Sequence, residues 1–322
     1  MRIVIGVVYQ FQFREVKQKN HKFNITNKVY HFFSNFAMMR TAVVILNWNT
    51  KDFLERFLPG LAASMPAGAE VVVADNGSTD GSLGLLDGKF HEIKQIRLDK
   101  NYGFTGGYNR AFKALKQMPD ASDLEYFLLI NSDIWATGAC LMVRASEYER
   151  MGGLDERFFA HMEEIDLCWR LQLEGKSICV VPESVVYHVG GGTLPNDSPW
   201  KLKLNYRNNL LMLSNNLAKT YALTGSPGKA VRKARRTIFL RKCLDGCSAL
   251  VYLLTGKTAP VKAVIEAHKE FRQMVSGTEI ADIQEYQESH QGITPPELFP
   301  GWIVFLAMTK GNRIFAYLRK KI

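Results

Sequence analysis

The hydrophobic residues in the first half of the chain alternate between short continuous runs and stretches with helical spacing. Residues 41–46 form a β-branched run that is typical of a strand buried on both faces. Comparable runs occupy residues 70–74, 93–98 and 126–130, and the segments between them, such as 52–64, carry apolar residues at helical spacing. This order predicts an α/β fold with a Rossmann-like, mostly parallel sheet flanked by helices and right-handed crossovers.

Polar residues follow each predicted strand, at 47–49, 75–76, 101–103 and 131–133. The carboxyl ends of parallel strands meet at one edge of the sheet, where open α/β sheets bind their ligands. We therefore expect the four polar segments to line one crevice. In the last segment, Asp133 is placed to hold a divalent cation, which prefers oxygen ligands. Taken alone, the same residue could equally start a turn or cap a helix.

Two further groups of residues carry candidate chemistry. Glu163-Glu-Ile-Asp166 opens a predicted helix, and three carboxylates in four residues exceed what favourable helix-start electrostatics requires. A carboxylate beside the apolar Phe158-Phe159 pair would have a raised pKa and could act as a general base. His188 ends a short predicted strand just before three glycines, which makes it a candidate metal ligand, although a lone His is more often structural.

The charge of the chain is unevenly distributed. The net charge is +10, but residues 41–200 carry fourteen Lys and Arg against twenty-two Asp and Glu, while residues 201–322 carry twenty against eight. A nucleic-acid-binding protein would concentrate basic residues on its recognition element, so the acidic, motif-bearing middle argues against nucleic acid as a partner. The basic last third favours contact with an anionic membrane surface. The five Cys include no CxxC pair, which indicates free thiols in a reducing compartment.

The pattern divides the chain into three parts. Residues 1–38 are interpreted as an N-terminal extension outside the native protein, because Met38-Met39 stands directly before the first clear strand. Residues 39–217 form the α/β domain and end in a predicted helix from Pro199 that bears Arg207 and the pair Asn208-Asn209. Residues 218–322 form a basic, helical region, loop-rich at 276–300. No apolar run is long enough to span a membrane, so surface association is expected, with a basic helix packed on the sheet domain as the alternative.

The ordered motifs resemble those of family 2 glycosyltransferases of the GT-A fold, and more narrowly the bacterial rhamnosyltransferase-like branch. The similarity covers residues 41–217 well and the remainder loosely. The blocks that carry it are Val44-Ile-Leu-Asn-Trp-Asn49, Val73-Ala-Asp-Asn-Gly-Ser-Thr-Asp-Gly81, Asn101-Tyr-Gly-Phe-Thr-Gly-Gly-Tyr-Asn109, Leu129-Ile-Asn-Ser-Asp133, Gly152-Gly-Leu-Asp-Glu-Arg-Phe-Phe159, Glu163-Glu-Ile-Asp-Leu-Cys-Trp-Arg170 and Tyr187-His-Val-Gly-Gly-Gly-Thr193.

The resemblance implies an inverting transferase of cell-surface polysaccharide synthesis. It would use a UDP- or dTDP-sugar donor and a saccharide or polyprenyl-linked acceptor, at the cytoplasmic face of the plasma membrane. Glu164 would be the general base, and Asp133 and His188 would hold Mg²⁺ or Mn²⁺. The donor-binding residues implied by the resemblance are Asn47, Asp75, Asn76, Asn101, Gly103, Gly107, Asn109 and Asn131.

One interval departs from the family pattern. Only 30 residues separate Asp133 from Glu164, whereas this interval in the family is longer and supplies much of the acceptor surface. The chain is therefore expected to lack part of the acceptor-side segment. This leaves open an alternative function, a catalytically impaired nucleotide-sugar-binding or partner protein. A nucleotidyltransferase fits less well, because Asn47-Trp-Asn-Thr50 stands where a Gly-rich basic loop would be.

Overall fold

The computed structural model describes residues 40–119, 123–131, 134–135, 140–179, 187–188, 198–296 and 298. The predicted extension at 1–38 lies outside these residues. In the described part, all five cysteines are free thiols, as the sequence predicts.

A five-stranded sheet forms the centre of the first half of the chain, in the order β3-β2-β1-β4-β6. β1 pairs in parallel with β2 and β4, and β2 pairs in parallel with β3. The prediction of a mostly parallel sheet is therefore confirmed. The described residues after Asp133 include two more strands, β5 and β6, and β6 runs antiparallel to β4. The strands are β1 (Thr41–Asn47), β2 (Ala69–Asp75), β3 (Lys94–Arg97), β4 (Tyr126–Asn131), β5 (Ile134–Trp135), β6 (Cys140–Arg144) and β7 (Tyr187–His188).

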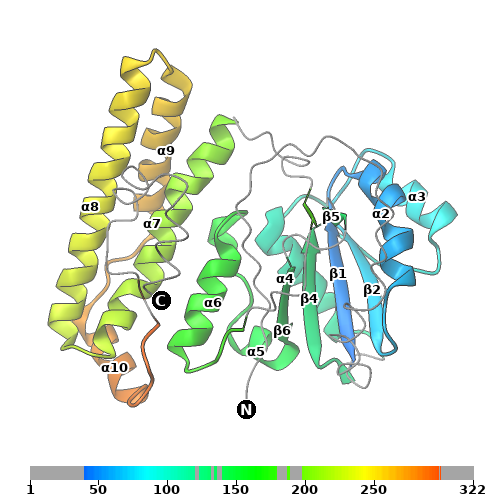
Figure 1. The fold of residues 1–322 in the computed structure, drawn as a ribbon, viewed down its shortest axis with the longest axis horizontal. Helices are drawn as coiled ribbons and strands as arrows, with labels where there is room; N and C mark the ends of the chain where they lie inside the picture. The colour runs from blue at the N-terminus through cyan, green and yellow to red at the C-terminus, as the bar shows by residue number, and fades with distance from the viewer. Residues whose placement is uncertain are drawn as a thin grey trace.

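Helices cover both faces of this sheet, which explains why the strands read as continuous apolar runs. Along β1, Val44 and Leu46 face a core that α4, α5 and α6 complete, while Val43 and Ile45 face a core completed by α2 and α3. Figure 1 shows these helices on opposite sides of the strands. The flanking helices are α2 (Lys51–Ala63), α3 (Ser82–Lys89), α4 (Gly103–Lys116), α5 (Ala145–Arg150) and α6 (Glu163–Leu173).

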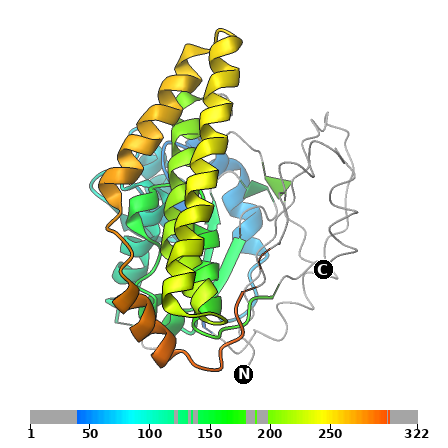
Figure 2. The ribbon, with the colours of Figure 1, turned by 90° about the vertical axis from the view of Figure 1, so that its left-hand side faces the viewer.

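The C-terminal helices form a further layer against α6, and Figure 2 shows α8 and α9 as a hairpin that extends beyond the sheet. Their shared core joins Trp169 and Leu173 of α6 to α7 through α10. The predicted boundary at residue 217 lies inside α7, whose Leu217 and Ala222 pack in the same core. These helices are α7 (Pro199–Ala222), α8 (Pro227–Leu254), α9 (Thr258–Met274) and α10 (Ile280–Ser289).

One segment of the C-terminal region differs from the sequence prediction. Residues 276–300 were expected to be loop-rich, but α10 forms there because Ile283 is buried and the Tyr286 hydroxyl donates to the Leu173 carbonyl at 2.7 Å. Among the described helices, none combines the length and apolar character needed to cross a bilayer.

Candidate active site

The carboxyl ends of β1 and β2 carry polar side chains that bond to one another. Asn47 is paired with Asp75 in the sheet register. Its Nδ2 donates to Asp75 Oδ2 at 2.8 Å and to Ser78 Oγ at 3.1 Å, and Asp75 Oδ1 accepts from the Ser78 amide at 2.9 Å. Asn47 and Asp75 are both buried. Asn47 and Asp75, both predicted to bind the nucleotide-sugar donor, therefore lie together, and their hydrogen bonds shape the loop after β2.

Asn76 extends this network to the start of α4. Its Nδ2 donates to Asn101 Oδ1 and to the Gly103 carbonyl, each at 3.0 Å, and its Oδ1 accepts from the Tyr102 amide at 3.0 Å. Asn101 Oδ1 also accepts from the Gly103 amide at 2.8 Å. Three of the predicted strand-end segments thus meet in one hydrogen-bonded cluster, as expected from the parallel sheet.

The predicted glycines of α4 allow close packing. Gly103 has a φ of +72°, and a Cβ there would lie 2.5 Å from the Phe159 ring. A Cβ on Gly107 would lie 2.7 Å from Leu46 and 3.1 Å from Asn76 Nδ2. Any side chain at either position would displace a neighbour, so these glycines bring the first turn of α4 against β1 and the loop around Phe159.

Asn109 holds the turn that precedes α6. Its Oδ1 accepts from the Tyr148 hydroxyl at 2.7 Å and from the Leu154 amide at 3.0 Å, while its Nδ2 donates to the Leu154 carbonyl at 2.8 Å. Gly153, with φ +72°, lets its backbone pass close to the same amide. The contacts that the structure shows for Asn109 are with the chain itself.

Glu164, the predicted base, lies near the carboxyl end of β4. Burial raises the pKa of Tyr108, and the nearby Glu164 raises it further. The Tyr108 hydroxyl in turn donates to the Ile130 carbonyl at 2.7 Å. Asn131 follows Ile130, and its buried Oδ1 has no hydrogen-bond donor among the described residues. The structure therefore brings Glu164 and Asn131 to the same edge of the sheet.

Glu163 and Glu164 are adjacent carboxyl groups in the first turn of α6. Burial raises the pKa of Glu163 well above its usual range, and the neighbouring Glu164 adds to the rise. Burial also raises the pKa of Glu164, but its own backbone amide and a hydrogen bond with Glu163 oppose that rise. Burial thus raises the pKa of both carboxyl groups, and the pair favours holding one proton between its two members.

The predicted metal ligands are described only in part. Asp133 and the side chain of His188 lie outside the described residues. The backbone of β7 is described, and it pairs antiparallel with β5 so that His188 lies opposite Ile134, the residue after Asp133 in the sequence. Within the described residues, no three His, Cys, Asp or Glu side chains gather as a metal site.

The structure adds residues that the motifs did not single out for the site. Burial and Lys201 lower the pKa of His161 to about 4, so this imidazole is neutral at neutral pH. Arg207 and Asn208 of α7 bond to the backbone just before Glu163. Their signal in the sequence is the polar run Arg207-Asn-Asn209 directly before the apolar Leu210-Leu-Met212 in a helical pattern. Polar residues that are buried in a helix need specific partners.

Comparison with known proteins identifies what the chain is similar to. Residues 42–176 match the model of glycosyl transferase family 2. The chain is 21% identical over 255 residues to N-acetylglucosaminyl-diphospho-decaprenol L-rhamnosyltransferase of Mycobacterium tuberculosis, covering 53% of this chain and 83% of that protein. It is 32% identical over 77 residues to rhamnosyltransferase WbbL of Escherichia coli, covering 23% of this chain and 29% of that one.

Among solved structures, the chain is similar to the mannosyltransferase PcManGT from Pyrobaculum calidifontis in complex with GDP-Man and Mn²⁺. The identity is 12% and the TM-score 0.45, with 81% of this chain and 86% of that chain covered. S. aureus TarS 1-349 in complex with UDP gives 15% identity and a TM-score of 0.42, with 74% and 95% covered. Both scores are below 0.5, so neither structure fixes a detail of this site. Residues 42–176 thus match glycosyl transferase family 2, and the chain is similar in sequence to rhamnosyltransferases.

Proposed function

We propose that this protein transfers a sugar, with inversion, from a nucleotide-sugar to a saccharide or polyprenyl-linked acceptor in cell-surface polysaccharide synthesis. The observation that carries the proposal is the Glu163–Glu164 pair at the start of α6, which lies at the edge of the sheet where β4 ends. Glu163 is buried, Glu164 is half-buried, and burial raises the pKa of both; a carboxyl group with a raised pKa suits a residue that must accept a proton from an acceptor hydroxyl.

In this proposal, Glu164 takes the proton as the acceptor oxygen attacks the anomeric carbon. General base catalysis of this kind contributes about 10²–10⁴-fold. In this proposal Glu163 retains its own proton, because burial raises its pKa well above the usual range, and Glu164 is the member of the pair that takes the acceptor proton. The donor would lie over the cluster of Asn47, Asp75 and Asn76, with its base and ribose toward the ends of β1 and β2 as the family resemblance suggests.

The metal is proposed to be Mg²⁺ or Mn²⁺, held by Asp133 and His188. Two observations fit such a site. β5 and β7 pair so that His188 lies opposite the residue after Asp133, and Asn131 Oδ1 is a buried acceptor without a described donor. When bound, a divalent cation would neutralise charge on the departing diphosphate without a proton donor.

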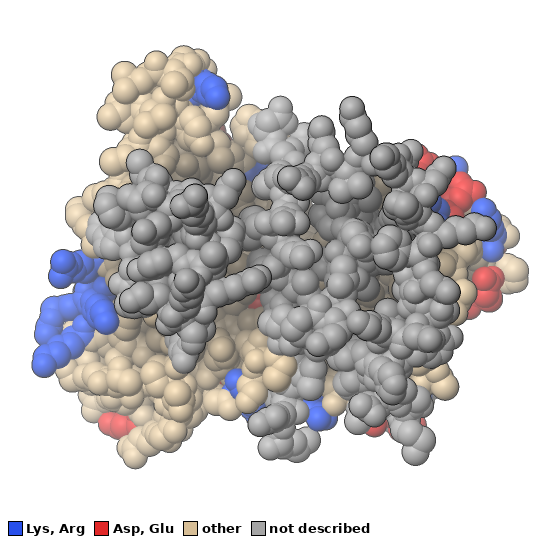
Figure 3. Space-filling view, in the orientation of Figure 1, with Lys and Arg blue, Asp and Glu red and all other residues tan. Residues whose placement is uncertain are grey.

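We further propose that α8 places the protein at the inner face of the plasma membrane. In its first half, the exposed side chains include Lys229, Arg232 and Arg236, and Figure 3 shows Lys and Arg gathered at that edge of the molecule. Toward the tip of the hairpin, Leu250 and Leu254 are 55% and 78% exposed. Basic residues that attract anionic head groups, followed by apolar residues, suit a helix that lies on a bilayer.

The test of the transfer reaction is a screen of nucleotide-sugars with purified protein and a polyprenyl-linked saccharide acceptor, scored by nucleoside diphosphate release. Glu164→Gln keeps the size of the side chain but removes the base, so release should fall about 10²–10⁴-fold. The matched control is Glu174→Gln just after the other end of α6, where the half-buried Glu174 pairs with Arg150 and His290. Equal rates for the two variants would eliminate Glu164 as the base, and donor binding without turnover for any acceptor would favour the non-catalytic alternative.

The metal assignment has a separate test. Release should require Mg²⁺ or Mn²⁺ and stop with a chelator, and Asp133→Ala should weaken the apparent affinity for the ion. Metal dependence that is the same in Asp133→Ala and the unmodified protein would show that this carboxylate is not a ligand.

A further inference from the structure

The loop before Glu163 has an unusual backbone. Phe159, His161 and Met162 have φ values of 63°, 72° and 73°, in a region where non-glycine residues are uncommon. Each such residue costs free energy and persists only where the surroundings fix it. Met162 directly precedes the Glu163–Glu164 pair, so whatever holds this loop also sets where the two carboxyl groups lie.

Asn208 of α7 holds the loop from one side. This side chain is fully buried, and its Nδ2 donates to the carbonyls of Phe158 at 3.0 Å, Ala160 at 2.6 Å and His161 at 2.9 Å. An amide group has only two N–H bonds, so at least one of them is shared. A single side chain therefore binds three carbonyls of the loop, those of Phe158, Ala160 and His161.

Arg207, the preceding residue, sets the orientation of that amide. Its Nε donates to Asn208 Oδ1 at 2.9 Å, which turns Asn208 Nδ2 toward the loop. Its Nη2 donates to the Phe158 carbonyl at 2.8 Å and to the Arg157 carbonyl at 3.2 Å. On its other side, Nη1 pairs with Glu270 of α9 at 2.8 Å. The loop is thus tied through Arg207 to the C-terminal helices.

The opposite side of the loop contacts the start of α4, beside the residues predicted to bind the nucleotide-sugar donor. The Phe159 carbonyl accepts from the amides of Phe104 at 2.6 Å and Thr105 at 3.2 Å. These are first-turn amides of α4, which have no partner within their own helix. The Phe159 ring also packs against Gly103, where no Cβ would fit. The same loop therefore caps α4 and leads into Glu164.

We infer that Arg207 and Asn208 are positioning residues that hold the loop at 158–162 so that it presents Glu164 to the acceptor and caps α4. This inference rests on the proposed role of Glu164 as the base. It makes the C-terminal helices part of the active-site scaffold, because the residues that fix the catalytic loop lie on α7 and are supported by α9.

The test compares Asn208→Ala with Asn205→Ala. Asn205 lies one turn earlier on α7, and its side chain makes no hydrogen bond within the described part of the chain. In Asn208→Ala, kcat should fall by up to about 10²-fold, the cost of a misplacement of about 1 Å, while KM for the donor changes little. Amide exchange should become faster at 104–105 and at 158–166, because the loop no longer has fixed partners, and should stay unchanged in α8 and α9. Asn205→Ala should alter neither readout.

A second variant keeps the test decisive if Asn208→Ala does not fold. Arg207→Lys retains a cation for Glu270 but lacks the planar fork that reaches Asn208 and the carbonyls, so the same local increase in exchange and the same fall in kcat are expected. Unchanged exchange at 158–166 would overturn the inference, and so would an increase spread evenly over α7 to α10, which would indicate a role in packing alone. Because exchange needs no substrate, it decides the role of the two residues even if the unmodified protein shows no turnover, a result that would count against the proposed function instead.

Discussion

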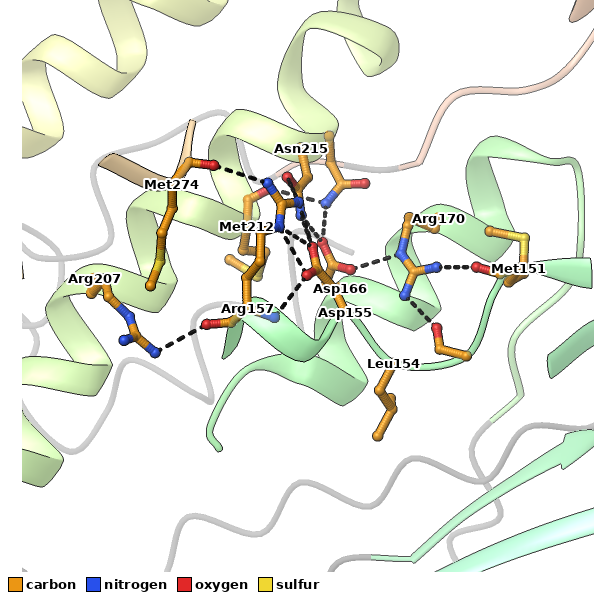
Figure 4. Close-up of polar contacts among 12 residues, drawn as sticks. Met151, Leu154, Asp155, Arg157, Asp166, Arg170, Arg207, Met212, Asn215 and Met274 are labelled. Atoms are coloured by element: carbon orange, nitrogen blue, oxygen red, sulfur yellow. Dashed lines mark hydrogen bonds and ion pairs between the residues drawn. The ribbon is translucent and has the colours of Figure 1, made fainter. Parts of the chain in front are cut away.

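Asp166→Asn gives a sharp test of how α6 is held against α7. Asp166 is fully buried. Its Oδ2 accepts from Arg170 Nε at 2.7 Å, and its Oδ1 accepts from Asn215 Nδ2 at 3.0 Å and Asn216 Nδ2 at 2.8 Å. Figure 4 shows how these contacts converge on the carboxylate. Both oxygens face donors, so an amide at this position must turn its own NH₂ toward one of them.

The magnitude follows from what remains after the change. Removing one partner of a buried ion pair costs about 3–5 kcal/mol, and a buried donor left without an acceptor costs about 1–3 kcal/mol. Arg170 keeps two other acceptors, the carbonyls of Met151 and Gly153, each at 2.9 Å. Costs of residues in one network are not additive, so we expect a loss near the lower end, about 3 kcal/mol in the free energy of unfolding.

Urea unfolding followed by far-UV circular dichroism measures this loss, provided that the slope with urea concentration is unchanged. The control is Asp87→Asn, the same chemical change in the surface pair between Asp87 and Arg97, whose side chains are 54% and 49% exposed. Exposed pairs contribute about 0–1 kcal/mol. A loss for Asp166→Asn no larger than for Asp87→Asn would show that the buried network does not hold the two helices together.

Four further outcomes are expected. Burial raises the pKa of Glu163 in the folded state, so the contribution of this group to stability is present at low pH and is lost as the pH rises through the raised pKa. In urea unfolding, Glu163→Gln should therefore be more stable than the unmodified protein at pH 8 but not at pH 4. An equal gain in stability at both pH values would contradict this. Glu163→Leu removes the hydrogen bond that lowers the pKa of Glu164, so the acidic limb of the kcat/KM profile should move to higher pH, whereas an unmoved limb would separate the two carboxyl groups. Gly107→Ala should lower the free energy of unfolding by about 1–3 kcal/mol, because the new Cβ would overlap Leu46. Leu254→Glu should reduce the fraction of protein that sediments with anionic vesicles but should not change nucleoside diphosphate release in detergent. Unchanged sedimentation would refute the proposed membrane-binding surface.

The sequence by itself determined the elements whose signal is local. The apolar runs of β1, β2 and β4 and the polar residues that follow them are visible without any long-range information, because strand burial and helix spacing are short periodic patterns. Given a parallel sheet, the meeting of Asn47 with Asp75 and of Asn76 with Asn101 follows from those patterns. The acidic start of α6 could also be singled out from the sequence, because three carboxylates in one turn exceed what a helix start needs.

Only the tertiary structure decided how these elements support one another. No local pattern in the sequence predicts that β6 runs antiparallel to β4, that α10 packs against Leu173, or that Phe159 has a positive φ. The contacts that fix that loop join residues 47 to 50 positions apart, and such pairings depend on which helix faces the loop in space. A buried Arg or Asn must find partners wherever the fold provides them. The fold alone shows that Arg207 and Asn208 are buried and that their partners are the carbonyls before Glu164, the proposed base.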